Sequence, residues 1–257
     1  MFISDISCNI QNYYLHSCSE SNHFMKNIIS IDAIKKFGFE FLSIFIGVFA
    51  AFALDSWNET RKDKYVEIKI LSEINNGLKQ DIQDMELNMM GHKEGIEATT
   101  FFQKAILSLP INHDSTNVYY FRLFRDFIST QNSSGYQTLK SKGLEIIDND
   151  SLRFQILSLY ENDYNSIRKL EEEYSELQFH KNYYAKFNDC FAENLIFDTK
   201  GVVKGMNSPL ALTTKQKNIL LLDLYRIKRN RMFVLSIYED IIVKIKALQQ
   251  NIEEELQ

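Results

Sequence analysis

The strongest hydrophobic pattern in the chain is an apolar run from Phe37 to Leu54, in which Glu40 is the one charged residue. At about 1.5 Å per residue this run forms a helix of about 27 Å, close to the roughly 30 Å hydrocarbon core of a bilayer. Two lysines precede the run, and Trp57 followed by further cations comes after it, as expected for side chains at a membrane interface. The pattern predicts a single-pass transmembrane helix over residues 37–56.

Two alternatives to a transmembrane helix are a buried core helix and a cleaved signal sequence. The phenylalanines recur all round the helix rather than along one stripe, which argues against a core helix. The sequence Ala51-Phe-Ala53 resembles a cleavage site, but the residues ahead of the run are far too many for an ordinary leader. Membrane lipid is therefore the partner expected for this segment.

Small and polar residues share one face of the predicted membrane helix. Helical spacing brings together Glu40, Ser43, Gly47, Ala50 and Ala51. Such a face lets two backbones approach closely, so self-association of the chain as a homo-oligomer is the hypothesis for it. The carboxylate of Glu40 either turns towards protein or extends to the nearby lipid headgroups.

A seven-residue repeat follows the membrane segment, in a stretch without proline. Apolar residues with one asparagine alternate steps of three and four, as the a and d positions of a coiled coil do. The predicted seam consists of Ile68, Leu71, Asn75, Leu78, Ile82, Met85 and Met89. This face packs either against a second chain or against later helices of the same chain.

The rest of the chain also has helical patterns. Residues 215–257 lack glycine and proline and repeat apolar residues by four and three, while Asn149 or Asp150 can cap another long helix. Shorter helices are expected over residues 96–109 and 118–129, Gly143 is expected to end a helix with positive φ, and residues 198–209 form the clearest loop. The fold class predicted is all-α: a single-pass transmembrane helix that continues into a long-helix bundle or coiled-coil-like domain.

Three parts follow from these patterns: an N-terminal segment (1–36), the transmembrane helix (37–56) and a helical soluble domain (57–257). The net charge of −5 and the absence of a basic face in the sequence pattern argue against nucleic acid as a partner. Three cysteines, without a C-x-x-C pair, exclude a disulfide framework and a structural zinc site. The histidines are isolated, and the acidic run Glu171-Glu172-Glu173 is interpreted as a solvated face. The sequence thus predicts no catalytic, cofactor or metal residues, and a protein that is not an enzyme.

Two stretches resemble a known family. The first runs from Phe39 through Asp55-Ser-Trp-Asn-Glu59, and the second is Tyr136-Gln-Thr-Leu-Lys-Ser-Lys-Gly143 with the helix start that follows it. Together they resemble the DUF6090 type, an uncharacterised family of Bacteroidetes membrane proteins. The resemblance implies a short cytoplasmic N-terminus and a helical domain outside the cytoplasm, and it implies no enzyme activity. The first thirty residues depart from the family, because Lys26 is their one cation where the family has a strongly basic start.

The function expected is that of a membrane-anchored helical scaffold or sensor at the cell envelope, which binds a protein partner that the sequence does not identify. The alternative is an oligomeric membrane effector or ion-coupled subunit that uses Glu40. The location expected is the bacterial inner membrane, crossed once, with the C-terminal domain in the periplasm.

Overall fold

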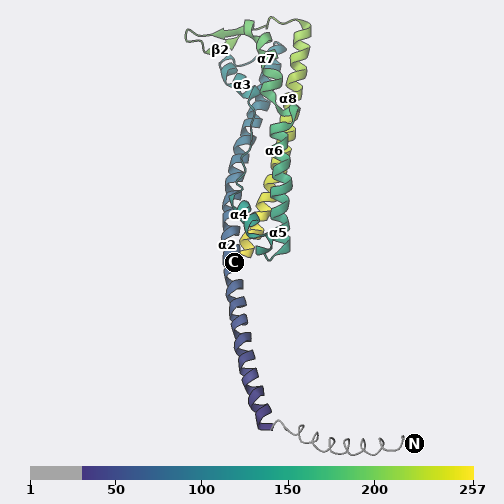
Figure 1. Cartoon of the computed structure of the whole chain (residues 1–257). Helices are drawn as coiled ribbons and strands as arrows, with labels where there is room; N and C mark the ends of the chain where they lie inside the picture. The colour runs from purple at the N-terminus through teal and green to yellow at the C-terminus, as the bar shows by residue number, and fades with distance from the viewer. Residues whose placement is uncertain (1–30) are drawn as a thin grey trace, which may run out of the picture. The chain divides into compact units, whose positions relative to one another are not determined.

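The structure, a computed structural model, describes residues 31–257, so most of the predicted N-terminal segment, with Cys8 and Cys18, lies outside the described residues. The predicted all-α fold class is confirmed, since most of the described chain is helical and its two strands are short (Figure 1). The longer elements are α2 (Ile31–Ile106), α3 (Thr116–Phe124), α4 (Ser134–Lys142), α5 (Asp150–Leu157), α6 (Tyr164–Glu173), α7 (Phe179–Phe191), β1 (Leu195–Phe197), β2 (Val203–Met206) and α8 (Thr214–Glu255). A π-helix over Ser158–Asp163 joins α5 to α6.

The chain divides into two compact units, with the boundary between Lys62 and Asp63. The first unit contains the N-terminal part of α2, where the apolar run lies. The second unit is the helical domain, and its packing begins six residues after the start predicted at residue 57. Tyr65 is still exposed, whereas Glu67 and Ile70 are buried, so the change from an exposed to a packed helix occurs within about one turn.

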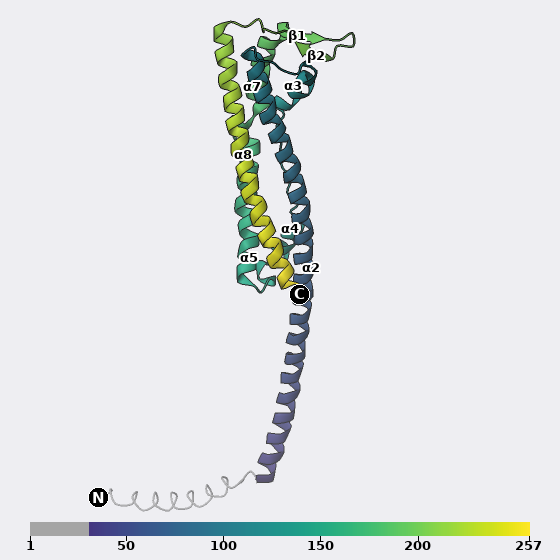
Figure 2. The same ribbon diagram turned by 180° about the vertical axis from the view of Figure 1, so that it is seen from behind.

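The helical domain is a bundle of long helices in which α8 lies antiparallel to α2 (Figures 1 and 2). Asn75 near the start of the domain donates a hydrogen bond to Glu253 near the end of α8, and His92 further along α2 contacts Arg231. The α5–α6 helical run lies beside α8, where Asn251 donates to Gln155 and Lys244 pairs with Asp163 at 2.5 Å. The core between these helices consists mainly of Leu, Ile, Phe and Tyr side chains.

Most of the heptad face of α2 is buried within the domain. Leu71, Asn75, Leu78, Met85 and Met89 are buried. Ile82 is partly buried and packs on the core, whereas Ile68, the first member of the predicted seam, is 43% exposed. Asn75 of this face donates to Glu253 and accepts from Gln249, both on α8. Of the two alternatives for the seam, packing on later helices of the same chain is the one seen within the described residues.

Helix α2 extends beyond the point where the sequence suggested a break. Residues 96–106, predicted to belong to a separate short helix, form its last turns, although Gly91 and Gly95 precede them. A glycine within a helix costs roughly 1 kcal/mol relative to alanine. Both glycines face bulky side chains of other elements, because an added Cβ would lie 2.1 Å from the Phe127 ring at Gly91 and 2.5 Å from Arg231 at Gly95.

The predicted loop over residues 198–209 is wrong in part, because β2 lies within it and pairs antiparallel with β1. The connection is a tight turn in which the Asp198 carboxylate accepts hydrogen bonds from the backbone N–H groups of Lys200 and Val202, at 2.8 and 2.9 Å. Gly201 completes the turn with a φ of +77°, which a glycine adopts without strain. Strands of three and four residues are too short to show a period-two pattern.

Candidate functional site

The apolar segment, Phe37–Leu54, lies on α2 with its side chains exposed. Each of its Phe, Leu, Ile and Val side chains is at least half exposed, and by length and composition this part of α2 is able to cross a membrane. Trp57 follows about one turn later and Arg61 about two turns later, with the guanidinium 5.8 Å from the centre of the indole ring. An aromatic and a cation at this position suit the interface between lipid and water.

The predicted association face is open within the described chain. Glu40, Ser43, Gly47, Ala50 and Ala51 are all exposed, and apart from the backbone of the helix itself no atom lies within 4 Å of a Cβ added at Gly47. Ser43 donates its hydroxyl hydrogen bond to the backbone carbonyl of Glu40, at 2.8 Å. Association of two chains through this face stays a prediction.

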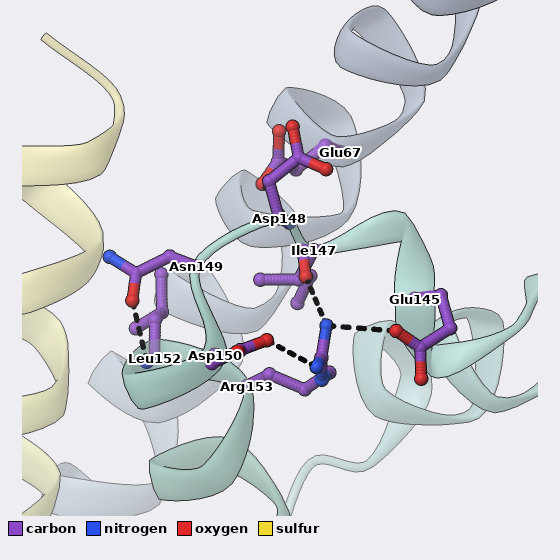
Figure 3. Close-up of polar contacts among 8 residues, drawn as sticks. All are labelled: Glu67, Glu145, Ile147, Asp148, Asn149, Asp150, Leu152 and Arg153. Carbon is purple, nitrogen blue, oxygen red and sulfur yellow. Dashed lines mark hydrogen bonds and ion pairs between the residues drawn. The ribbon is translucent and has the colours of Figure 1, made fainter.

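A corner of the helical domain, residues 143–153, connects α4 to α5 (Figure 3). Gly143 ends α4 with a φ of +105°, as the sequence predicted, and its N–H donates to the Leu139 carbonyl. Asn149 then caps α5, because its side-chain oxygen accepts the Leu152 N–H at 3.1 Å. The predicted cap is therefore confirmed at Asn149.

The corner is bonded to both long helices. The carboxylate of Glu67, buried on α2, accepts the Asp148 N–H at 3.2 Å, and the Asn149 amide donates to Glu255 of α8 at 2.8 Å. Lys64 lies 2.8 Å from Glu67 and 3.5 Å from Glu255, and its hydrogen bond to Glu67 raises the Lys64 pKa. The first turns of α2 in the domain, the corner and the last turn of α8 thus form one polar junction.

Arg153 holds the backbone of the corner in place. Its guanidinium donates to the carbonyl of Ile147 at 2.8 Å, contacts Glu145 at 3.2 Å and pairs with Asp150 (Figure 3). Ile147 itself is fully buried and anchors the corner in the core. The bonds of Arg153 and the burial of Ile147 fix the backbone of the corner, which is a structural role.

Two aspartates of α2 hold the segment that leads into α4. Asp81 is buried, and its carboxylate accepts the Asn132 N–H and the Tyr164 hydroxyl, each at 2.6 Å. Burial raises the pKa of Asp81 to about 6 despite these two hydrogen bonds. Asp84, one turn later, accepts the Thr130 N–H at 2.8 Å.

The most deeply buried charge is the guanidinium of Arg231 on α8, which is fully enclosed. It donates to the carbonyls of Leu123 and Arg125 at 3.0 and 2.9 Å, lies 3.1 Å from Nδ1 of His92, and stacks 4.2 Å from the centre of the Phe179 ring. Burial lowers the Arg231 pKa to about 10, so the group stays charged at neutral pH. We call Arg231, His92, Phe127 and Phe179 the arginine cluster.

The interpretation of Glu171 as part of a solvated face is wrong. Its side chain is buried on α6 and accepts hydrogen bonds from the Ser129 N–H at 2.9 Å, from the Ser129 hydroxyl and from the Tyr238 hydroxyl. Burial raises the Glu171 pKa. Glu172 and Glu173 are exposed, as expected.

Sequence reasoning missed the arginine cluster, although a signal for it exists. Arg231 stands on the same repeat of α8 as Ile227, Val234 and Tyr238, which are buried. On α2, Gly91 and Gly95 are four residues apart and therefore share a face. A cation on an apolar stripe together with two glycines on one helix face indicates a buried long side chain.

Among residues 31–257, no group of three His, Cys, Asp or Glu side chains is placed to hold a metal ion. No curated protein and no solved structure matches the chain. A family of unknown function, DUF6090, matches residues 40–206, which takes in the apolar segment from Glu40 on, α3 to α7, the corner and the β-hairpin. Since that match spans more than half of the sequence, the chain belongs to the DUF6090 family.

Proposed function

We propose that the chain is a non-enzymatic, membrane-anchored helical protein that acts as a scaffold or sensor for a protein partner at the cell envelope. The observation that carries the proposal is the apolar segment, whose large side chains are all at least half exposed. Burial of apolar surface contributes about 25 cal/mol per Å², and lipid tails provide that burial without a protein neighbour.

The bonding of the buried charged groups supports a structural role for the domain. Asp81, Glu171 and Arg231 bond to backbone groups or tyrosine hydroxyls of segments that are distant in sequence. Such bonds fix how loops sit on long helices. The polar junction at Glu67 joins the corner and the end of α8 to the first turns of the domain, so a partner that shifts α8 would act on this junction.

Membrane anchoring is tested by flotation of membranes from cells that express the full chain. We expect the protein to float with the membranes, to resist extraction at high pH and to be released by detergent. A variant with Ile46→Arg and Phe49→Arg should lose flotation, because charges at the centre of an apolar segment oppose insertion. Leu107→Arg with Leu109→Arg, at exposed apolar sites of the domain, is the matched control and should still float. Recovery of the unaltered chain in the detergent-free supernatant would refute anchoring.

We further propose that the membrane is the bacterial inner membrane and that the helical domain lies outside the cytoplasm, as the family resemblance implies. Lys200, exposed in the turn of the hairpin, is a suitable labelling site. In a chain with Cys8, Cys18 and Cys190 replaced by serine, Lys200→Cys should react with a membrane-impermeant maleimide once the outer membrane is permeabilised. Labelling only after lysis of the inner membrane would place the domain in the cytoplasm.

A further inference from the structure

Charge is unevenly distributed along α8. The stretch 214–238 contains six cations and one acid, Asp223, whereas residues 239–255 contain five acids and two cations. The sequence-wide charge of −5 hides this asymmetry, so the expectation that the chain has no basic face does not hold for this part of α8. The first half of α8 is therefore a locally basic helix within an acidic protein.

Three of these six cations, Lys215, Arg226 and Arg229, are exposed, and Lys217 and Lys228 are half-buried. Arg231 is enclosed in the arginine cluster, and the buried Asp223 is already paired with Lys186 of α7 at 2.7 Å. Arg226 is exposed, and its ion pair with Asp223 is weak, because 3.9 Å separates the charged atoms. Arg229 is exposed and, among residues 31–257, forms no ion pair. Positive charge on this surface is thus largely uncompensated.

Large apolar side chains lie among the cations. Leu222, Tyr225, Met232 and Phe233 are 48 to 58% exposed. Helical spacing puts them with Arg226 and Arg229 on the outer side of α8, opposite the buried Leu224 and Ile227. We call these six residues the basic α8 face; from Leu222 to Phe233 it extends about 16 Å along the helix axis.

We propose that the basic α8 face binds an acidic amphipathic helix of a partner protein. This inference rests on the proposed function and names the surface and the chemistry of the partner. A helix of three to four turns, with carboxylates beside a narrow apolar stripe, would place its acids against Arg226 and Arg229 and its apolar side chains against Tyr225 and Phe233. Apolar anchors then supply most of the affinity, and charges select the partner.

The surroundings of the face favour a discrete helix over an anionic lipid surface. Acids stand at its edges: Glu176 is exposed, and its backbone carbonyl accepts a hydrogen bond from Asn230, while Glu239 and Asp240 follow on α8. A uniformly anionic surface would meet these acids as well as the cations. A helix whose carboxylates are spaced to match Arg226 and Arg229 contacts these two cations and avoids the acids at the edges.

The test uses the full chain in nanodiscs of neutral lipid and a fluorescent 18-residue helical peptide with leucines at positions i, i+3, i+4 and i+7 and glutamates between them. A peptide with lysine at each glutamate position is the control. We expect the acidic peptide to bind at least tenfold more tightly than the basic one, and its binding to weaken as salt rises. Arg226→Glu with Arg229→Glu should weaken binding at least tenfold.

Two further variants make the result specific. Lys69→Glu with Lys246→Glu changes net charge equally at exposed cations elsewhere, and it should alter binding less than twofold. Tyr225→Ala with Phe233→Ala should weaken binding without removing charge.

Equal binding of both peptides, or equal loss in the two charge-reversed chains, would overturn the inference. So would binding, through Arg226 and Arg229, of vesicles with 30% phosphatidylglycerol but not of the peptide. A chain that floats with membranes yet ignores the peptide overturns only this inference, whereas loss of flotation overturns the proposed anchoring.

Discussion

The guanidinium of Arg231 on α8 fills the space that Gly95 leaves open on α2. A Cβ at residue 95 would lie 2.5 Å from both Cζ and Nε of Arg231. A long side chain normally moves away from such a contact at little cost. Arg231 is fully buried, however, and its bonds to the carbonyls of Leu123 and Arg125 hold it in place. The absence of a side chain at residue 95 is therefore part of how a charge is accommodated in this core.

Replacement of Gly95 by alanine should destabilise the domain. Alanine gains roughly 1 kcal/mol of helix propensity over glycine, but overpacking of a rigid core costs about 1–3 kcal/mol, and displaced Arg231 would leave carbonyls unpaired. We expect Gly95→Ala to lower the free energy of unfolding by about 1–2 kcal/mol net in urea titrations of the detergent-solubilised chain.

The control for this prediction is a double-mutant cycle. Arg231→Ala removes the Cδ, Nε and Cζ atoms that a new Cβ would strike, so Gly95→Ala should be neutral or stabilising in that background. Additive losses in the cycle would show that the two residues act independently.

The long helices could be predicted from the sequence because their signals are local. The apolar repeat of α8 and the cap at Asn149 need no knowledge of the rest of the chain. By contrast, the extension of α2 past Gly91 and Gly95 depends on Phe127 and Arg231, which reach it from other elements. Helix propensity alone counts those glycines as breaks, whereas tertiary packing keeps the helix continuous through them.

Buried polar groups were harder to predict for a related reason. Glu171 stands in a run of three glutamates that suggests a solvated face, yet it is buried because Ser129 and Tyr238 supply donors. Those partners lie 42 and 67 residues away in sequence. Glu171 is on the side of α6 that faces the core, whereas Glu172 and Glu173 are exposed. The three residues are otherwise identical in type, so the sequence alone does not separate them.

His92 should make the stability of the domain depend on pH. Burial, and secondarily the neighbouring Arg231 guanidinium, lower its pKa from 6.5 to about 3. Between these values the unfolded chain binds a proton that the folded chain does not, so the free energy of unfolding falls as pH falls from about 6.5 towards 3. The contribution of one such group is at most about 1.4 kcal/mol per pH unit.

The comparison of variants isolates this contribution. Asp126 and Glu171 line the same small cavity as His92, and burial raises the pKa of both carboxyls, so their contributions have the opposite sign. His92→Gln should therefore lose more stability relative to the unaltered chain at pH 7 than at pH 4.5. A pH-independent effect of His92→Gln would contradict the assignment.

Asn149→Ala should weaken the corner by a small, defined amount. The change removes the cap on the Leu152 N–H and the bond to Glu255, and loss of a cap typically costs about 1 kcal/mol. Ser151→Ala, at an exposed position in the first turn of α5, is the matched control and should change stability by less than about 0.5 kcal/mol. Equal effects of the two variants in urea titrations would show that the cap contributes nothing.

Glu40→Gln separates the proposed scaffold from an ion-coupled assembly. Glutamine keeps the size of the side chain and removes its charge, in the one position where the apolar segment carries an acid. For a scaffold, we expect flotation with membranes, the oligomeric state in mild detergent and binding of the acidic peptide to change less than twofold, because Glu40 contributes its charge to none of them. Gly47→Leu places a large side chain on the same face. It should keep two backbones apart and so reduce any oligomer that this face forms. Loss of ion flux across proteoliposomes in Glu40→Gln, with the oligomer intact, would instead establish that the carboxylate works inside the membrane and that the chain is an effector and not a scaffold.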